Sequence, residues 1–149
     1  MRRLFIKNHF KKYGIDSFPP SWKTLEQTSF GGLSKLYGNL KNNIKSKNLI
    51  AEEFGAVNHT YLPSWLKSIT IIRNLCAHHS RLWNKNLPCA PKLLSKPPYH
   101  WIKNTPKEHE FKHLYIYLCI MKYLLDRIQQ NSNLGKEIEG LLVKYNNVD

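Results

Sequence analysis

The sequence has few acidic residues and few cysteines. Among 149 residues, ten Asp and Glu face 23 Lys and Arg, which gives a formal net charge of +13. The three cysteines, Cys76, Cys89 and Cys119, are odd in number and show no CxxC spacing. This argues against a disulfide framework and against a cysteine zinc site, and it favours a reducing compartment.

Long apolar runs are also lacking. The most apolar segment, Leu114–Met121, lies between Lys112 and Lys122 and is far shorter than the roughly 20 residues that a membrane crossing requires. The N-terminus shows no apolar run of signal-peptide length. We therefore expect a soluble, cytoplasmic protein that does not associate with membranes.

No stretch alternates polar and apolar residues with the period of a strand, and no internal repeat is visible. The hydrophobic content of 42% and the four tryptophans argue against disorder. Gly31-Gly32 is not followed by the GK[ST] of a phosphate loop. We predict a single all-α domain spanning residues 1–149.

The positive charge is uneven along the chain. Residues 1–50 carry ten Lys and Arg against two acids, whereas residues 101–149 carry seven against six. Such asymmetry favours a polyanionic partner, either nucleic acid or an anionic membrane surface, although many soluble domains are basic without binding one.

Proline and glycine divide the chain into helical segments. Five prolines within residues 85–107 predict an irregular loop. Gly55 is placed as a C-cap, and Gly31-Gly32 is expected to interrupt a helix. The segments predicted to be helical are Leu4–Tyr13, a segment starting at Trp22 with Ser21 as its cap, Leu33–Lys41, Asn48–Phe54, Pro63–Trp83, Glu110–Gln130 as a buried central helix, and Leu134–Tyr145.

The segment Pro63–Trp83 divides into two faces at 100° per residue. Arg73 and His78, about 140° apart on a helix, form the two edges of a cationic stripe that would accept a phosphate or a partner helix. The expected core face comprises Trp65, Ile69, Ile72, Cys76 and Trp83, and the stripe comprises Lys67, Thr70, Arg73, Asn74, Ala77, His78 and Arg81.

His79 projects near the core face, so we expect a hydrogen-bonded structural histidine there, with Trp83 also structural. The simplest interpretation of the stripe is a solvated helix face. Against it, Asn74 and His78 are mediocre helix formers, and an ordinary exposed face would favour Lys, Glu and Gln.

Twelve consecutive residues of this segment resemble a known motif. The run from Arg73 to Asn84 is similar to the Arg-Asn-x-Cys-Ala-His-His-x-Arg-Leu-Trp-Asn signature of the Abi-like family of abortive-infection, phage-defence proteins. Pro19–Trp22, Ser29–Gly31 and Leu33–Tyr37 resemble another recurring segment of that family. Known members are about twice as long, so the resemblance implies a C-terminal half that a preceding region or a partner protein would complete.

The Abi-like family is placed within the HEPN superfamily, whose hallmark is an arginine, four to six residues, and a histidine, often with a polar residue directly after the arginine. Arg73, Asn74 and His78 match this hallmark. The resemblance implies a HEPN-like helical bundle and metal-independent endoribonuclease activity without a cofactor. It also implies a homodimer in which two such helices meet.

The chemistry of RNA cleavage agrees with that implication. The RNA 2′-hydroxyl is the nucleophile, histidine titrates near neutrality, and a guanidinium is a permanently charged phosphate ligand. We expect Arg73 to stabilise the phosphate, His78 to transfer the proton and Asn74 to orient His78 or to donate to the phosphate. The residues expected to extend the RNA-binding surface are Lys7, Lys11, Lys12, Lys67 and Arg81.

Two rival hypotheses stay open. The same stripe could be the interface of a non-catalytic assembly module in a defence or toxin–antitoxin system, or the chain could be a folded remnant without activity. His109 and His113 have a zinc-like i, i+4 spacing but no third ligand, so no metal site is expected. Tyr99 and Trp101 could stack on bases, or they could pin the proline-rich loop onto the core.

Overall fold

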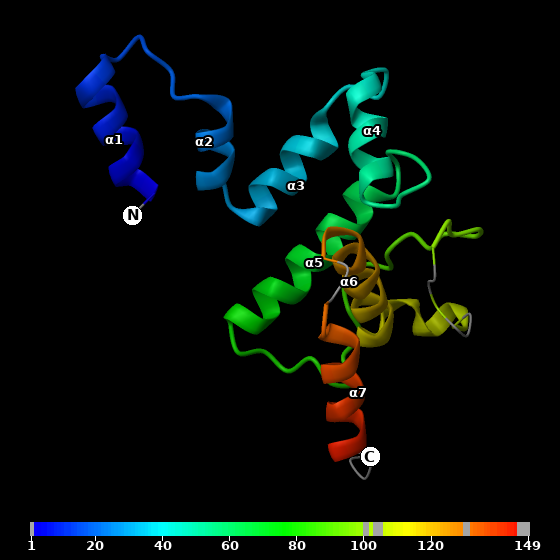
Figure 1. The fold of residues 1–149 in the computed structure, drawn as a ribbon. Helices are drawn as coiled ribbons and strands as arrows, with labels where there is room; N and C mark the ends of the chain where they lie inside the picture. Colours follow the sequence, from blue (N-terminus) through cyan, green and yellow to red (C-terminus); the bar gives the residue numbers. More distant parts are fainter. Residues whose placement is uncertain (1, 100–101, 103–105, 130–131, 146–149) are drawn as a thin grey trace.

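The computed structural model describes residues 2–99, 102, 106–129 and 132–145. Over these residues it is helical and contains no strand, which confirms the all-α prediction (Figure 1). Within the same residues, no helix has the length and apolarity needed to cross a membrane. The elements are α1 (Arg2–Tyr13), α2 (Ser21–Gln27), α3 (Phe30–Asn39), α4 (Lys45–Glu53), α5 (Leu62–Ala77), the 3₁₀-helix η1 (Glu108–Lys112), α6 (Leu114–Ile128) and α7 (Leu134–Lys144).

The core forms where α5 packs between α3 and α6. Trp65 of α5 is fully buried, and its ring meets that of Tyr123 edge-on at 5.7 Å between centroids. The Trp65 indole N–H donates to the carbonyl oxygen of Lys92 at 2.8 Å, so its polar atom is satisfied. The buried apolar side chains are Tyr37, Ala51, Ala56, Leu62, Trp65, Ile72, Leu87, Leu94, Ile116, Tyr117, Ile120, Tyr123 and Leu124.

The proline-rich loop is irregular at its described residues, as predicted, yet it is anchored to the helices. Leu87 and Leu94 are buried in the core. The Lys92 amide donates to the Ser64 hydroxyl at 3.0 Å, and the Tyr117 hydroxyl donates to the Cys89 carbonyl. Burial raises the pKa of Tyr117, because the apolar surroundings disfavour a phenolate.

Tyr99 packs onto the core rather than standing free. The Arg127 guanidinium lies 4.2 Å from the centre of the Tyr99 ring, and that ring lies 6.3 Å from the ring of Tyr123. Tyr99 therefore helps to pin the loop. Trp101, considered with it as a stacking residue, lies outside the described residues.

Gly55 ends α4 as predicted, with a φ of +75° that L side chains rarely adopt. Its carbonyl accepts a hydrogen bond from the Tyr123 hydroxyl at 2.8 Å. A Cβ at position 55 would lie 2.9 Å from that hydroxyl oxygen, so glycine is required by conformation and by space. Burial raises the pKa of Tyr123 to about 12.

Lys47 is a buried cation that stabilises the end of α3. Its side chain is only 2% exposed, and its ammonium donates to the carbonyls of Gly38 at 3.1 Å and Leu40 at 2.6 Å and to Asn42 Oδ1 at 2.9 Å. These carbonyls belong to the C-terminal end of the helix, where the backbone leaves acceptors without partners and favours positive charge. The Lys47 ammonium therefore serves as a helix cap supplied from α4.

Two predictions for the N-terminal region are wrong. Ser21 is the first residue of α2, and Pro20 occupies the cap position without a side-chain hydrogen bond. Gly31 and Gly32 do not interrupt a helix but lie in the first turn of α3, whose cap is Ser29, accepting from the Gly32 amide at 3.1 Å. A Cβ on Gly31 would lie 3.4 Å from Thr70 Cγ2 of α5, which is an ordinary contact, whereas a Cβ on Gly32 would lie 2.7 Å from Thr28 Cγ2, which is too close.

The segment predicted as one helix over Glu110–Gln130 is divided in two. His113 is extended, with φ −92° and ψ 156°, and separates η1 from α6. Tyr115 of α6 is half-exposed, so α6 is buried along one side rather than all round. The helix α7 follows as predicted.

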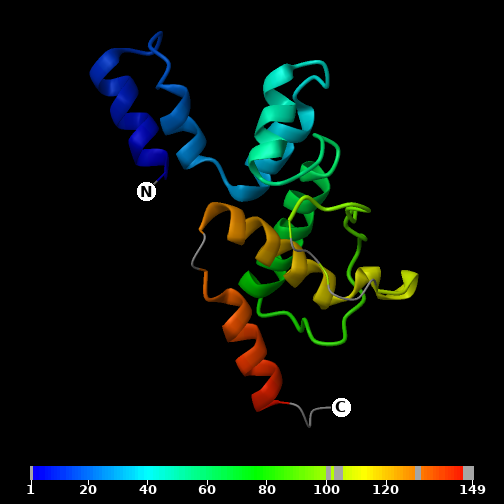
Figure 2. The same ribbon diagram turned by 45° about the vertical axis from the view of Figure 1, so that its right-hand side comes forward.

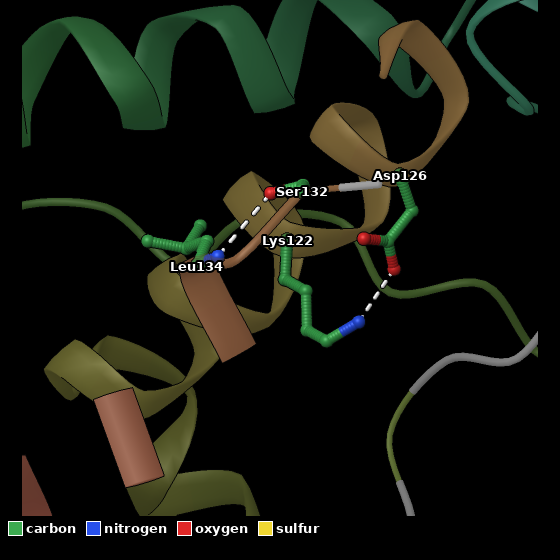
Figure 3. A network of polar contacts seen from close by, with 4 residues as sticks. All are labelled: Lys122, Asp126, Ser132 and Leu134. Atoms are coloured by element: carbon green, nitrogen blue, oxygen red, sulfur yellow. Dashed lines mark hydrogen bonds and ion pairs between the residues drawn. The ribbon is translucent and has the colours of Figure 1, made fainter. Parts of the chain in front are cut away.

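At the joint between α6 and α7, Lys122 forms an ion pair with Asp126 at 2.5 Å, and the Leu134 amide donates to the Ser132 hydroxyl at 3.3 Å (Figure 3).

The helices α1 and α2 form an arm, defined as residues 2–27, that projects from the rest of the molecule in both views (Figures 1 and 2). The two helices contact each other where the Lys23 ammonium lies 5.5 Å from the centre of the Phe5 ring. A His9 ring nitrogen of α1 also lies 2.9 Å from the carbonyl oxygen of Ser17, in the turn between the helices. No side chain from residue 4 to residue 27 is buried. The arm therefore contributes nothing to the core.

Candidate functional site

The end of α5 carries the residues predicted to act on RNA, and the helix ends earlier than predicted. It begins at Leu62, with Pro63 in its first turn, and its last helical residue is Ala77. The prediction that it continues to Trp83 is wrong, since the residues that follow Ala77 form a turn.

Two backbone hydrogen bonds close this helix. The His79 amide donates to the Cys76 carbonyl at 3.0 Å, and the Ser80 amide donates to the Leu75 carbonyl at 2.9 Å. His79 has a φ of +50°. This pattern is a Schellman motif, in which the left-handed position is usually occupied by glycine.

His79 and Trp83 consequently do not lie where a continuous helix would put them. The side chain of His79 is exposed, so the expectation of a buried, hydrogen-bonded histidine is wrong. Trp83 is 54% exposed, and Cys76, also assigned to the core face, is exposed. The contribution of His79 to the structure is its backbone conformation.

The hallmark residues do lie together at the projecting end of the helix. Arg73 and Asn74 are exposed in its last turns, and His78 follows as the exposed C-cap with φ −98°. The Arg73 Nη1 donates to the Asn74 Oδ1 at 3.1 Å, which ties the guanidinium to its neighbour. His78 still continues the helical path, so its spacing from Arg73 corresponds to about 140° around the axis.

Ala77 lies between these two edges, exposed, and is the last residue of the helix. Because its side chain is small, Ala77 protrudes little from the helix surface between Arg73 and His78. A phosphate or a second helix can therefore approach the backbone there.

The additional cations are distributed over separate elements. Lys67 is exposed on α5, six residues before Arg73, while Arg81 lies beyond the helix and its Nε donates to the Trp83 carbonyl at 3.0 Å. Lys7, Lys11 and Lys12 are exposed on α1, which stands apart from α5 in both views (Figures 1 and 2). The structure does not bring these three lysines beside Arg73.

Acidic neighbours do not neutralise these cations. Within the described part of the chain, the one ion pair is Lys122–Asp126 on α6, away from α5 and the arm. The positive charge of both regions therefore stays available to an external anion.

The remaining member of the stripe, Thr70, is half-buried. It packs against Gly31 of α3 and donates to the Leu66 carbonyl at 2.8 Å. This contact was not predicted. The adjacent glycines suggested a break, although small residues in a helix equally permit close helix packing.

The described side chains contain no group of three His, Cys, Asp or Glu residues placed to hold a metal ion. The side chain of His109, considered as a ligand with His113, lies outside the described residues.

One comparison with known proteins finds a relative. A family model described as Abi-like protein matches residues 1–84, which include the arm, α3, α4, α5 and the turn that follows. No curated protein and no solved structure matches. The match ends at Asn84, the last residue of the signature.

Proposed function

Because this chain belongs to the Abi-like family of abortive-infection proteins, we propose that it is a HEPN-type, metal-independent endoribonuclease or RNA-binding module of phage defence. The observation that supports this most is the exposed end of α5. There Arg73, Asn74 and His78 lie on one projecting helix terminus, and Arg73 is oriented by Asn74 at 3.1 Å.

The proposed reaction uses a nucleophile that the RNA supplies. His78 accepts the proton of a 2′-hydroxyl, the oxygen attacks the adjacent phosphorus, and the bond to the 5′-oxygen breaks. Arg73 stabilises the negative charge that develops on the phosphate, as a guanidinium does through paired N–H groups. The products are a 2′,3′-cyclic phosphate and a 5′-hydroxyl.

The 5′-oxygen must receive a proton when it leaves. The hallmark supplies one histidine per protomer, so a second His78 from another copy is the natural donor. We propose a homodimer with its two-fold axis near Ala77, because this small exposed residue lets two helix ends approach. Each chain would then offer His78 to the Arg73 of the other, as two-fold symmetry requires.

The test is cleavage of mixed RNA in the presence of EDTA. The chain should cut RNA and leave cyclic phosphate ends, and His78→Ala should remove the activity. His79→Ala is the matched control, because it removes the neighbouring exposed histidine and should leave cleavage largely intact. Magnesium-dependent products with 5′-phosphate ends, or full activity in His78→Ala, would refute the mechanism.

The rival function is assembly without catalysis, which the small, exposed Ala77 at the end of α5 favours because a second helix can approach there. Sedimentation of the wild-type chain and of Ala77→Leu separates the two. If Ala77→Leu dissociates a dimer and the wild-type chain cuts no RNA, the end of α5 is only an interface. If a strict monomer cuts RNA, the composite site is wrong.

A further inference from the structure

The arm exposes apolar side chains to an unusual extent. Phe18 and Ile15, in the turn between α1 and α2, are 85% and 83% exposed, more than any other large hydrophobic residue described. Trp22 is 62% exposed. The exposed apolar residues of the arm are Leu4, Ile6, Tyr13, Ile15, Phe18, Trp22 and Leu25. Seven exposed apolar side chains on two short helices and the turn between them favour a binding site, because a large exposed apolar surface on a monomer commonly marks one.

Cations accompany these apolar residues. The arm carries six Lys and Arg against two acids, Asp16 and Glu26. Lys7, Lys11, Lys12 and Lys23 are all exposed. Two of them lie beside rings: the Lys12 ammonium is 5.2 Å from the centre of the Tyr13 ring, and that of Lys23 is 5.5 Å from the centre of the Phe5 ring. A partner must therefore offer anions and apolar surface at close spacing.

An unpaired nucleic-acid strand supplies both groups within every nucleotide, a phosphate for the lysines and a base face for the aromatic rings. A duplex hides its base faces, and two arms facing each other would bring like charges together. The strand is thus the ligand whose chemistry complements the arm.

The base of the arm leads toward the end of α5. Directly after α2, the first turn of α3 lies against α5, where Gly31 faces Thr70. Thr70 is one helical turn before Asn74. The base of the arm therefore adjoins the helix that carries Arg73 and His78.

We propose that the arm binds unpaired RNA, with Phe18 and Trp22 stacking on bases and Lys11, Lys12 and Lys23 contacting phosphates. The inference rests on the proposed function in its choice of RNA. The arm is then a binding site separate from Arg73, Asn74 and His78, and it prefers single-stranded to duplex RNA.

The experiment measures binding rather than cleavage, in a His78→Ala background. The probes are a fluorescently labelled 20-nucleotide oligouridylate, a duplex of the same length and phosphatidylserine vesicles. Phe18→Ala combined with Trp22→Ala should weaken oligouridylate binding by about tenfold or more, since stacking contributes about 1–3 kcal/mol per base. The matched control is Tyr145→Ala, which removes an aromatic ring of similar exposure from the end of α7.

Replacing Lys11 and Lys12 with glutamine should weaken binding and reduce the dependence of affinity on salt by about one unit of slope per lost phosphate contact. Circular dichroism should show that these variants fold, because the arm buries no side chain in the core.

The outcomes of these measurements decide whether the arm binds unpaired RNA. Unchanged oligouridylate affinity in the Phe18 and Trp22 variant, equal binding of the duplex, or no binding by the wild-type sequence would overturn the inference. Loss of vesicle binding or of dimerisation, with RNA affinity unchanged, would assign the arm to lipid or to a second copy instead. Binding that depends on the arm in a chain that cuts no RNA would retain the inference while refuting the nuclease.

Discussion

The arm and the core differ in where their apolar side chains lie. From residue 37 onward the described residues bury thirteen apolar side chains around α5 and α6, whereas residues 4–27 bury none and expose seven. The family match covers the arm and α5 but not α6. The residues that match the family model therefore include the arm and the end of α5, whereas much of the core lies outside residues 1–84.

This contrast predicts that equal substitutions have unequal effects in the two regions. Trp65→Ala should lower the free energy of unfolding by about 3–5 kcal/mol, because it leaves a large cavity and removes a buried hydrogen bond. Trp22→Ala, an identical change at a residue 62% exposed, should alter it by less than about 0.5 kcal/mol. Urea unfolding of both variants measures the difference, and similar losses would show that the arm is part of the folded core.

The division between arm and core was only partly predictable from the sequence. Gly55 and Pro63 set helix limits through their own conformational preferences, and the predictions there are confirmed. The prediction for Gly31 and Gly32 is wrong because Ser29 caps a helix ahead of them, so that both glycines lie in its first turn. There the serine cap outweighs the low helix propensity of glycine.

The candidate site shows the same limit. The exposure of Arg73, Asn74 and His78 followed from helical periodicity, and the structure confirms it. The error began at Ala77, because the motif that closes α5 places a histidine where a glycine would have signalled the end. The burial of Lys47 was not predictable either, since a lysine in an amphipathic segment is ordinarily solvated.

The second prediction concerns Lys47. The core buries this lysine, whereas every lysine of the arm is exposed. Lys47→Met keeps most of the volume but leaves the carbonyls of Gly38 and Leu40 without their donor. The expected loss is about 2 kcal/mol. Lys45→Met on the exposed side of α4 is the control and should be nearly neutral. Equal stability of the two variants would mean that water replaces the ammonium.

A third prediction uses pH to test the burial of tyrosines in the core. Burial raises the pKa of Tyr123 from 10.0 to about 12 and also raises the pKa values of Tyr37 and Tyr117. A raised pKa means that the folded state holds the phenolic proton more tightly than the unfolded chain. The stability is therefore complete below pH 10 and falls as the pH rises toward 12, by at most about 1.4 kcal/mol per pH unit for each tyrosine.

Denaturant unfolding between pH 9 and 11.5 measures this loss. Tyr123→Phe should make the decline shallower, whereas Phe18→Ala in the arm removes no ionisable group and should leave its slope unchanged. A slope that Tyr123→Phe does not alter would contradict the burial of that hydroxyl.

The smallest effect on the free energy of unfolding is expected at the end of α5, where the side chains are exposed. His79 is exposed, so its side chain contributes little, but its φ of +50° carries a steric cost that glycine avoids. His79→Gly should raise the free energy of unfolding by about 0.5–1 kcal/mol, because the relief of strain exceeds the entropy that glycine adds to the unfolded chain. His78→Gly is the matched control: His78 has a negative φ, so the same change there should lower stability. Thermal unfolding of the two variants measures the opposite signs. Destabilisation by His79→Gly would mean that the imidazole, rather than the backbone turn, holds the end of this helix.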